Sequence, residues 1–184
     1  MPPNVIIDDS EILGLFSKAA TKELAFKHLV VKYQERLYWH IRRMVVSHDD
    51  TDDILQNLFI KVWKNLESFR SDANLYTWLY RIATNETLTW IEKEKKRKSI
   101  PLDGEDGIYT DKLIAEKGFD ANKIEWKLQQ AIQSLPEKQK AVFCLRYYEE
   151  MPYDEMAIIL DTSVGGLKAS YHHAVKKVES FLTS

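Results

Sequence analysis

Long stretches of this 184-residue chain carry apolar residues at intervals of three and four, and none of comparable length alternates apolar with polar residues. The longest of these stretches begins at Phe26 and continues through Leu29, Tyr33, Leu37 and Ile41. This spacing puts the apolar side chains on one face of an α-helix, whereas a half-buried strand needs a repeat of two. Only 6 Gly and 5 Pro interrupt the chain. The pattern therefore predicts an all-α protein.

Two further helices are expected between the long helix and residue 98. The first, over residues 54–66, has a broad apolar stripe and follows Asp50, Asp52 and Asp53, which favour the positive start of a helix. The second follows a short polar loop at residues 69–74, and a set of large apolar side chains recurs near one of its faces: Trp78, Leu79, Ile82, Ala83 and Trp90. Those residues are expected to lie in the core.

Polar residues that cap helices stand ahead of the first predicted helices. Ser10 precedes a short apolar group that includes Ile12 and Phe16, and Thr21 precedes the long helix described above. A hydroxyl at such a position accepts a hydrogen bond from a free backbone N–H of the first turn. We therefore expect Ser10 and Thr21 to be N-caps.

The remaining sides of the helix after residue 74 indicate contact with nucleic acid. They carry rings, amides and charges: Tyr76, Thr77, Tyr80, Arg81, Asn85 and Glu86. Lysine and arginine are concentrated in residues 93–98. Bases stack on aromatic rings at roughly 1–3 kcal/mol each while cations hold phosphates, so the combination suits a single strand. The alternative is an ordinary soluble helix whose last cations favour the helix dipole.

The periodicity fails between Pro101 and Asn122. This segment contains three glycines and a series of acids: Asp103, Glu105, Asp106, Asp111, Glu116 and Asp120. Such a composition predicts a flexible acidic linker over residues 101–123, with one helical domain at 1–100 and another at 124–184. The simplest interpretation of the linker is a passive spacer, since its charge would repel DNA phosphates.

The last 60 residues predict a helix-turn-helix. After the helix break at Pro136, a helix is expected over residues 137–148 and a short one over 153–160. A turn at Asp161 and Thr162 follows, and Ser163 is expected to cap the longer last helix. A set of polar and small residues faces outward on that helix, where it suits a DNA major groove: Lys168, Ala169, His172, His173, Lys176 and Lys177. Two-helix corners also occur in all-α proteins that never bind DNA.

Composition argues against several classes of protein. The single cysteine, Cys144, permits neither a disulfide nor a cysteine metal site within one chain, and the histidines have no metal-ligand spacing. No glycine-rich phosphate loop is present, so no cofactor is expected. The N-terminus lacks the features of a signal peptide, and no stretch approaches the ~20 apolar residues of a membrane span. A cytoplasmic protein without membrane insertion is the expectation.

Taken in order, these segments resemble the bacterial extracytoplasmic-function sigma factors, the small two-domain specificity subunits of RNA polymerase. AFKHLVVKYQERLY, DDILQNLFIKVWKNLESFR and YTWLYRIATNETLTW are similar to parts of the second domain of that family. SLPEKQKAVFCLRYYEEMPYDEMAIILDTSVGGLKASYHHAVKK is similar to its fourth domain. The resemblance implies a protein that binds core RNA polymerase and promoter DNA, is monomeric when free, often has an anti-sigma factor, and catalyses no reaction.

The resemblance also implies residue roles. Core polymerase would be bound by the segment that contains Asp53, Gln56, Asn57, Phe59 and Ile60. The melted strand of the minus-ten element would be bound by Lys61, Phe69, Asn74, Tyr80 and Asn85. The outward residues of the last helix would contact the minus-thirty-five element, with Lys168, His172 and His173 near base edges and Lys176 and Lys177 on phosphates.

The sequence departs from the family at two places. Asn57 stands where an acid is common, which weakens the charge component of polymerase binding, and Ser170, His173 and Val175 stand where arginine is frequent. We therefore expect weak DNA binding by the isolated last domain. Three other classes remain open from the residues alone: an enzyme, a dimeric DNA-binding repressor, and a helical scaffold for protein interactions.

Overall fold

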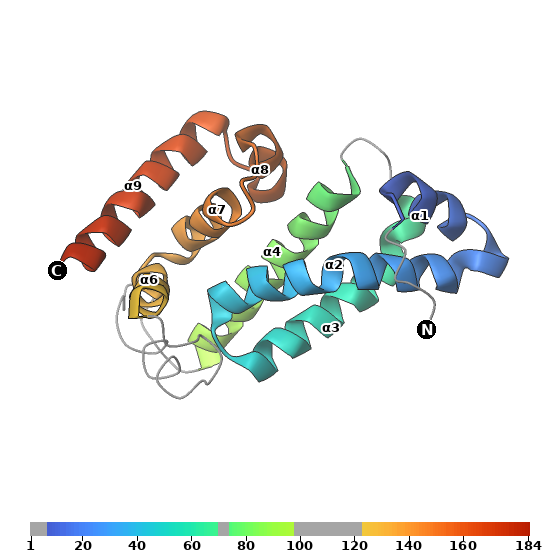
Figure 1. Cartoon of the computed structure of the whole chain (residues 1–184), viewed down its shortest axis with the longest axis horizontal. Helices are drawn as coiled ribbons and strands as arrows, with labels where there is room; N and C mark the ends of the chain where they lie inside the picture. The colour runs from blue at the N-terminus through green and yellow to red at the C-terminus, as the bar shows by residue number, and fades with distance from the viewer. Residues whose placement is uncertain (1–6, 70–73, 98–122) are drawn as a thin grey trace.

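The computed structural model describes residues 7–69, 74–97 and 123–184, and within these residues it contains helices and no strand. The elements follow one another in Figure 1 as α1 (Asp9–Phe16), η1 (Ala19–Thr21), α2 (Lys22–Val45), α3 (His48–Asn65), η2 (Leu66–Ser68), α4 (Leu75–Arg97), α6 (Lys123–Gln133), α7 (Glu137–Tyr147), α8 (Tyr153–Leu160) and α9 (Val164–Thr183). The all-α prediction is confirmed. The predicted linker falls almost entirely outside the described residues.

Helices α1 to α4 form the front bundle. Helix α2 packs against α1, α3 and α4, and α3 packs against α4. Their apolar stripes meet in a core that buries Leu37 and Ile41 of α2, Leu58 of α3 and Leu79 of α4 completely. Full burial of a side chain of this size stabilises a fold by about 1.5–3 kcal/mol. The three-and-four spacing of the sequence therefore corresponds to the core of this bundle.

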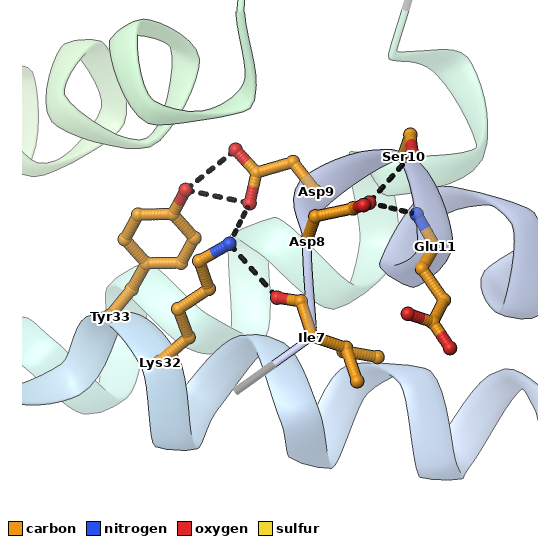
Figure 2. Close-up of polar contacts among 7 residues, drawn as sticks. All are labelled: Ile7, Asp8, Asp9, Ser10, Glu11, Lys32 and Tyr33. Carbon is orange, nitrogen blue, oxygen red and sulfur yellow. Dashed lines mark hydrogen bonds and ion pairs between the residues drawn. The ribbon is translucent and has the colours of Figure 1, made fainter. Parts of the chain in front are cut away.

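A polar network attaches α1 to α2 (Figure 2). The hydroxyl of Tyr33 donates to the Asp9 carboxylate at 2.7 and 2.8 Å, and the ammonium of Lys32 donates to Asp9 at 2.8 Å and to the Ile7 carbonyl at 3.0 Å. Burial and the nearby Asp9 carboxylate raise the pKa of Tyr33 well above its usual range. The phenol therefore stays protonated and remains a donor.

The first two helices are not capped as the sequence predicted. Asp8 is the N-cap of α1, with its carboxylate accepting from the Glu11 N–H at 2.8 Å. Ser10 lies inside the first turn and donates its hydroxyl to Asp8 at 2.6 Å. Thr21 does stand at the N-cap position of α2, but its hydroxyl donates to the Leu15 carbonyl at 2.7 Å and makes no capping hydrogen bond. A carboxylate is the stronger acceptor at a helix start, which favours Asp8 over Ser10.

Helices α6 to α9 form the back bundle. Phe143 and Leu145 of α7, Met156 of α8 and Leu167 of α9 are buried in its core. Asp161 follows the end of α8 and adopts a left-handed conformation with φ 48°. The Ser163 hydroxyl then caps α9 by accepting from the Gly166 N–H at 3.1 Å. The predicted helix-turn-helix is confirmed, with its turn and cap at the expected residues.

The two bundles pack against each other. Helix α7 contacts α2 and α4, α8 contacts α4, and α6 contacts α2, whereas α9 lies on the outer side of the back bundle (Figure 1). Two amides of α6 bind the front bundle directly, because Gln129 and Gln133 donate to the Arg43 carbonyl at 2.9 and 2.7 Å. The described parts of the chain are therefore held together by specific contacts between the bundles.

Candidate nucleic-acid interface

The outer face of α9 is open to solvent. Leu167, Ala174 and Val178 point into the back bundle and are buried. Every residue predicted to face outward on this helix is exposed: Lys168, Ala169, His172, His173, Lys176 and Lys177. An α-helix fits the major groove of B-form DNA, and cations along its exposed side can reach the phosphates. The geometry of α9 therefore permits DNA binding without any rearrangement of the back bundle.

Part of the predicted minus-ten set lies on a second accessible surface, at the side of the front bundle where α3 meets α4. Asn85 is exposed, and Lys61 of α3 forms an ion pair with Glu86 of α4. Phe69, just ahead of α4, is half-buried and packs against Trp78 with ring centroids 5.2 Å apart. An aromatic pair and an exposed amide are therefore available together on the same side of α4. Residues 70–73 of the predicted loop lie outside the described residues.

The other two residues of that set lie against the back bundle. Asn74 accepts from the Thr77 N–H at 2.7 Å, and its side-chain nitrogen donates to Glu155 of α8 at 3.4 Å. Tyr80 is completely buried, and its hydroxyl donates to Glu149 at 2.6 Å. The expectation that Thr77 and Tyr80 face solvent is wrong for this arrangement, because α7, α8 and the turn between them cover that side of α4.

A cluster of donors surrounds the Glu149 carboxylate; we call it the Glu149 cluster and define it as Glu149 with Arg36, Arg43, Tyr76 and Tyr80. The oxygen Oε2 of Glu149 accepts from Tyr80 at 2.6 Å, from Tyr76 at 3.2 Å and from Arg36 at 3.3 Å. The guanidinium of Arg43 lies 3.9 Å from Oε1. No local sequence signal indicates this cluster, because Glu149 is distant in sequence from all of its partners.

The residues predicted to bind polymerase lie along α3. Asp53, Gln56 and Asn57 are exposed, and Ile60 keeps 47% of its surface accessible. Phe59 is half-buried and packs edge-on against Phe26 at 6.3 Å. Helix α3 lies on the far side of α2 from α7 (Figure 1). It offers polar groups around one apolar side chain.

Three further features bear on the class of protein. Within residues 7–69, 74–97 and 123–184, no group of three or more His, Cys, Asp or Glu side chains is arranged to hold a metal ion. No helix in the same residues has the length and apolar character needed to span a membrane. Cys144 is a buried free thiol, and burial raises its pKa to about 12, so it is not a reactive thiolate.

Sequence families divide the chain along the same lines as the bundles. Residues 29–97 match the family Sigma-70 region 2, and residues 125–178 match the family Sigma-70, region 4. The first match covers most of the front bundle, and the second covers α6 to α8 and most of α9. These two regions, on two helical bundles with an exposed helix-turn-helix, define a sigma subunit of bacterial RNA polymerase.

Curated relatives narrow this class. The chain is 32% identical over 156 residues to the ECF RNA polymerase sigma factor SigW of Bacillus subtilis, covering 80% of this chain and 83% of that protein. It is 30% identical over 166 residues to the ECF RNA polymerase sigma-E factor of Escherichia coli K12, covering 85% of each. The chain belongs to the ECF sigma factor family: it is a transcription initiation factor that directs RNA polymerase to promoters and is not itself an enzyme.

Solved structures share the fold. The sigma factor RpoE of Bartonella quintana, in complex with the anti-sigma factor NepR, superposes with a TM-score of 0.69 at 18% identity, covering 86% of this chain and 96% of that one. CnrH in complex with the cytosolic domain of CnrY superposes with a TM-score of 0.67 at 20% identity, covering 95% and 97%. The helical arrangement is therefore that of sigma factors with known structures.

Proposed function

We propose that this sigma factor has three functional surfaces, one for core polymerase, one for the minus-ten strand and one for the minus-thirty-five element. Residues 1–100 bind core polymerase through α3 and receive the melted minus-ten strand beside α4, and residues 124–184 bind the minus-thirty-five element through α9, with residues 101–123 as the linker. The observation that supports this division most directly is the outer face of α9, where all six predicted contact residues are exposed.

Strand opening is assigned to Phe69 and Asn85, with Lys61 beside them. Taking a base out of the stack costs a few kcal/mol, which a pocket must return through hydrogen bonds and ring contacts. The exposed Asn85 amide supplies both a donor and an acceptor for a base edge, and the ring pair of Phe69 and Trp78 supplies an apolar wall. Lys61 would exchange its partner Glu86 for a phosphate.

Duplex recognition is assigned to α9. Lys176 and Lys177 lie nearer the C-terminal end of the helix and would hold phosphates, whereas Lys168, Ala169, His172 and His173 lie nearer its start and would contact base edges. Polymerase binding is assigned to Asp53, Gln56, Asn57, Phe59 and Ile60 on α3. The exposed Ile60 among polar groups suits a helical partner with a matching apolar position.

An anti-sigma factor is the expected regulator. One solved structure with this fold is the sigma factor RpoE in complex with the anti-sigma factor NepR, and another is CnrH in complex with the cytosolic domain of CnrY. We propose a similar partner for this chain, and a site of action in the cytoplasm with RNA polymerase. The free protein is expected to be a monomer, and gel filtration distinguishes it from a dimeric repressor that reads symmetric sites.

In vitro transcription tests the proposed function. Core RNA polymerase is mixed with the purified protein and a library of genomic fragments, and RNA start sites are mapped. The expected result is a set of starts that depends on the added protein and shares two sequence elements upstream. Core enzyme alone provides the control. Absence of new starts across a library that covers the whole genome would overturn the proposal.

A further inference from the structure

The Glu149 cluster joins the two bundles. Arg36 and Arg43 belong to α2, Tyr76 and Tyr80 belong to α4, and Glu149 lies in the turn that follows α7. The side chain of Glu149 keeps only 6% of its surface accessible, so its bonds to these donors are shielded from water. Charge-assisted hydrogen bonds in such a setting are stronger than those on an open surface. The carboxylate is thus a main point of attachment between the bundles.

Two other carboxylates bind α4 from the same side. The Thr77 hydroxyl donates to Glu155 of α8 at 2.7 Å, and Asn74 donates to the same carboxylate at 3.4 Å. Lys95, near the end of α4, forms an ion pair with Glu137 at the start of α7. The back bundle therefore presents acids to one face of the front bundle at three levels along α4.

The donors around Glu149 are suited to an anionic oxygen in general. Burial, together with the Glu149 carboxylate, raises the pKa of Tyr76 to about 12 and that of Tyr80 well above its usual range, so both phenols remain donors. Their rings lie 4.5 Å apart, and the guanidinium of Arg36 lies 5.0 Å from the Tyr76 ring centroid. Two phenols and two guanidinium groups that converge on one oxygen pair would bind a phosphate equally well.

The position of this donor set relates it to the promoter strand. Tyr76 and Tyr80 are on the helix that also carries Asn85, with Phe69 and Trp78 at its start. Tyr80 precedes Asn85 by five residues, so the two side chains point about 140° apart around α4, and a strand with a base at Asn85 would cross the helix to bring its neighbouring phosphates to the Tyr76 and Tyr80 hydroxyls. In the packed arrangement those phosphates are excluded, because Glu149 and Glu155 occupy the donors. The face of α9 remains exposed, so the exclusion applies to the front bundle alone.

We propose that Glu149 is an intramolecular substitute for a DNA phosphate: it keeps the two bundles closed, and it leaves the Arg36, Tyr76 and Tyr80 site when the bundles separate and promoter DNA is bound. This inference rests on the proposed function, because it assigns the regulation of strand binding by the same bundle. Closure makes the free protein a poor binder of single strands. Opening on the polymerase uncovers the site.

The first test compares two adjacent carboxylates. Glu149→Gln removes the charge from the Glu149 cluster, whereas Glu150→Gln makes the same chemical change at an exposed neighbour whose side chain points to solvent. Binding of a fluorescein-labelled 20-nucleotide poly(dT) strand is measured by fluorescence anisotropy at low salt. We expect roughly tenfold tighter binding for Glu149→Gln and no change for Glu150→Gln. Adding Arg36→Gln to Glu149→Gln should remove most of the gain.

The second test measures closure directly. Spin labels at Lys64→Cys on α3 and Glu179→Cys on α9, both exposed, report the distance between the bundles by pulsed electron paramagnetic resonance. We expect a longer distance to become populated in Glu149→Gln, and also in Tyr80→Phe, which removes one donor to the carboxylate. Circular dichroism checks that each variant retains its helices.

The outcomes separate this inference from the proposed function. Unchanged distances and unchanged strand binding in Glu149→Gln would overturn the inference even if the wild-type protein directs transcription. Opening without tighter binding would overturn the role of the donors as a phosphate site. Failure of the proposed function would be seen instead as an absence of protein-dependent starts with wild-type protein, whatever the variants do.

Discussion

The ammonium of Lys140 lies 2.9 Å from the side-chain oxygen of Gln133, and both groups are buried where the back bundle meets the front. Burial lowers the pKa of Lys140 to about 8, even though Glu137 opposes the shift. The nitrogen of the same Gln133 amide donates to the Arg43 carbonyl of α2 at 2.7 Å. One amide therefore solvates a buried amine and connects the bundles.

Replacing Gln133 by alanine should destabilise the protein. The attraction between Glu137 and Lys140 remains, but the Lys140 amine loses a hydrogen-bond acceptor and the Arg43 carbonyl loses one of its two amide donors. We expect the free energy of unfolding to fall by about 2 kcal/mol. Urea unfolding monitored by circular dichroism measures the change. Gln130→Ala, on the same helix at a half-buried position, is the matched control and should cost under about 0.5 kcal/mol. Equal effects of the two substitutions would contradict the prediction.

His40 should make the protein less stable in mild acid. Burial lowers the pKa of this imidazole from 6.5 to about 4, although the Glu149 carboxylate opposes the shift. Between these two values the unfolded chain binds a proton that the folded protein does not, so the free energy of unfolding falls as the pH is lowered through that window. The full effect is about 3 kcal/mol.

Urea unfolding at several pH values between 7 and 4 measures the effect of His40. His40→Gln keeps a group that can bond the Thr84 hydroxyl, which lies 2.9 Å from His40 Nε2, and its stability should depend less on pH. His173→Gln changes an exposed histidine and should retain the wild-type dependence. A wild-type pH dependence in His40→Gln would show that other groups are responsible.

Asn85→Ala should impair promoter opening and leave polymerase binding intact. Loss of the amide removes hydrogen bonds to a flipped base, which corresponds to roughly a tenfold decrease in open complexes. Permanganate footprinting of unpaired thymines reports opening, and native gel shifts with core enzyme report binding. Thr89→Ala, exposed about one turn further along α4, is the control and should behave as wild type. Phe69→Ala should have a similar effect on opening, together with some loss of stability because Phe69 packs on Trp78.

Lys176→Ala should weaken upstream promoter contact about equally for all sequences. A lysine that holds one phosphate releases about one counterion, so the slope of log affinity against log salt should decrease in magnitude by about 1. Binding of the polymerase complex to duplex promoter fragments over a series of salt concentrations gives the slope. Lys18→Ala, an exposed lysine of the front bundle, should leave it unchanged. An unaltered slope in Lys176→Ala would mean that this lysine does not contact a phosphate.

The sequence predicted most of the features that depend on residues close to one another in the chain. Apolar spacing predicted the long helices, and the turn at Asp161 with the Ser163 cap predicted the helix-turn-helix. The outward residues of α9, such as Lys168 and His172, were correctly placed, because the spacing of apolar residues within one helix shows which of its faces is buried. The prediction of Ser10 as the first N-cap was wrong, because Asp8, two positions earlier, is also a good cap and takes that role.

The contact between the bundles could not be predicted in the same way. Thr77 and Tyr80 are polar enough to face water, and the pattern of α4 does not reveal that a distant segment covers them. Their acceptors, Glu155 and Glu149, lie 78 and 69 residues away in sequence. A single sequence carries no record of such a pairing, because the partners share neither a helix nor a turn.

Helix α2 contacts both bundles, since it packs against α1, α3 and α4 of the front bundle and against α6 and α7 of the back bundle. A truncated fragment that ends with α4 would expose the phenols of Tyr76 and Tyr80. It would also expose the face of α2 that the back bundle covers. In isolation such a fragment would expose an aggregation-prone surface to solvent. Its DNA binding would be measured without Glu149, the carboxylate that competes for the same tyrosine donors in the whole chain.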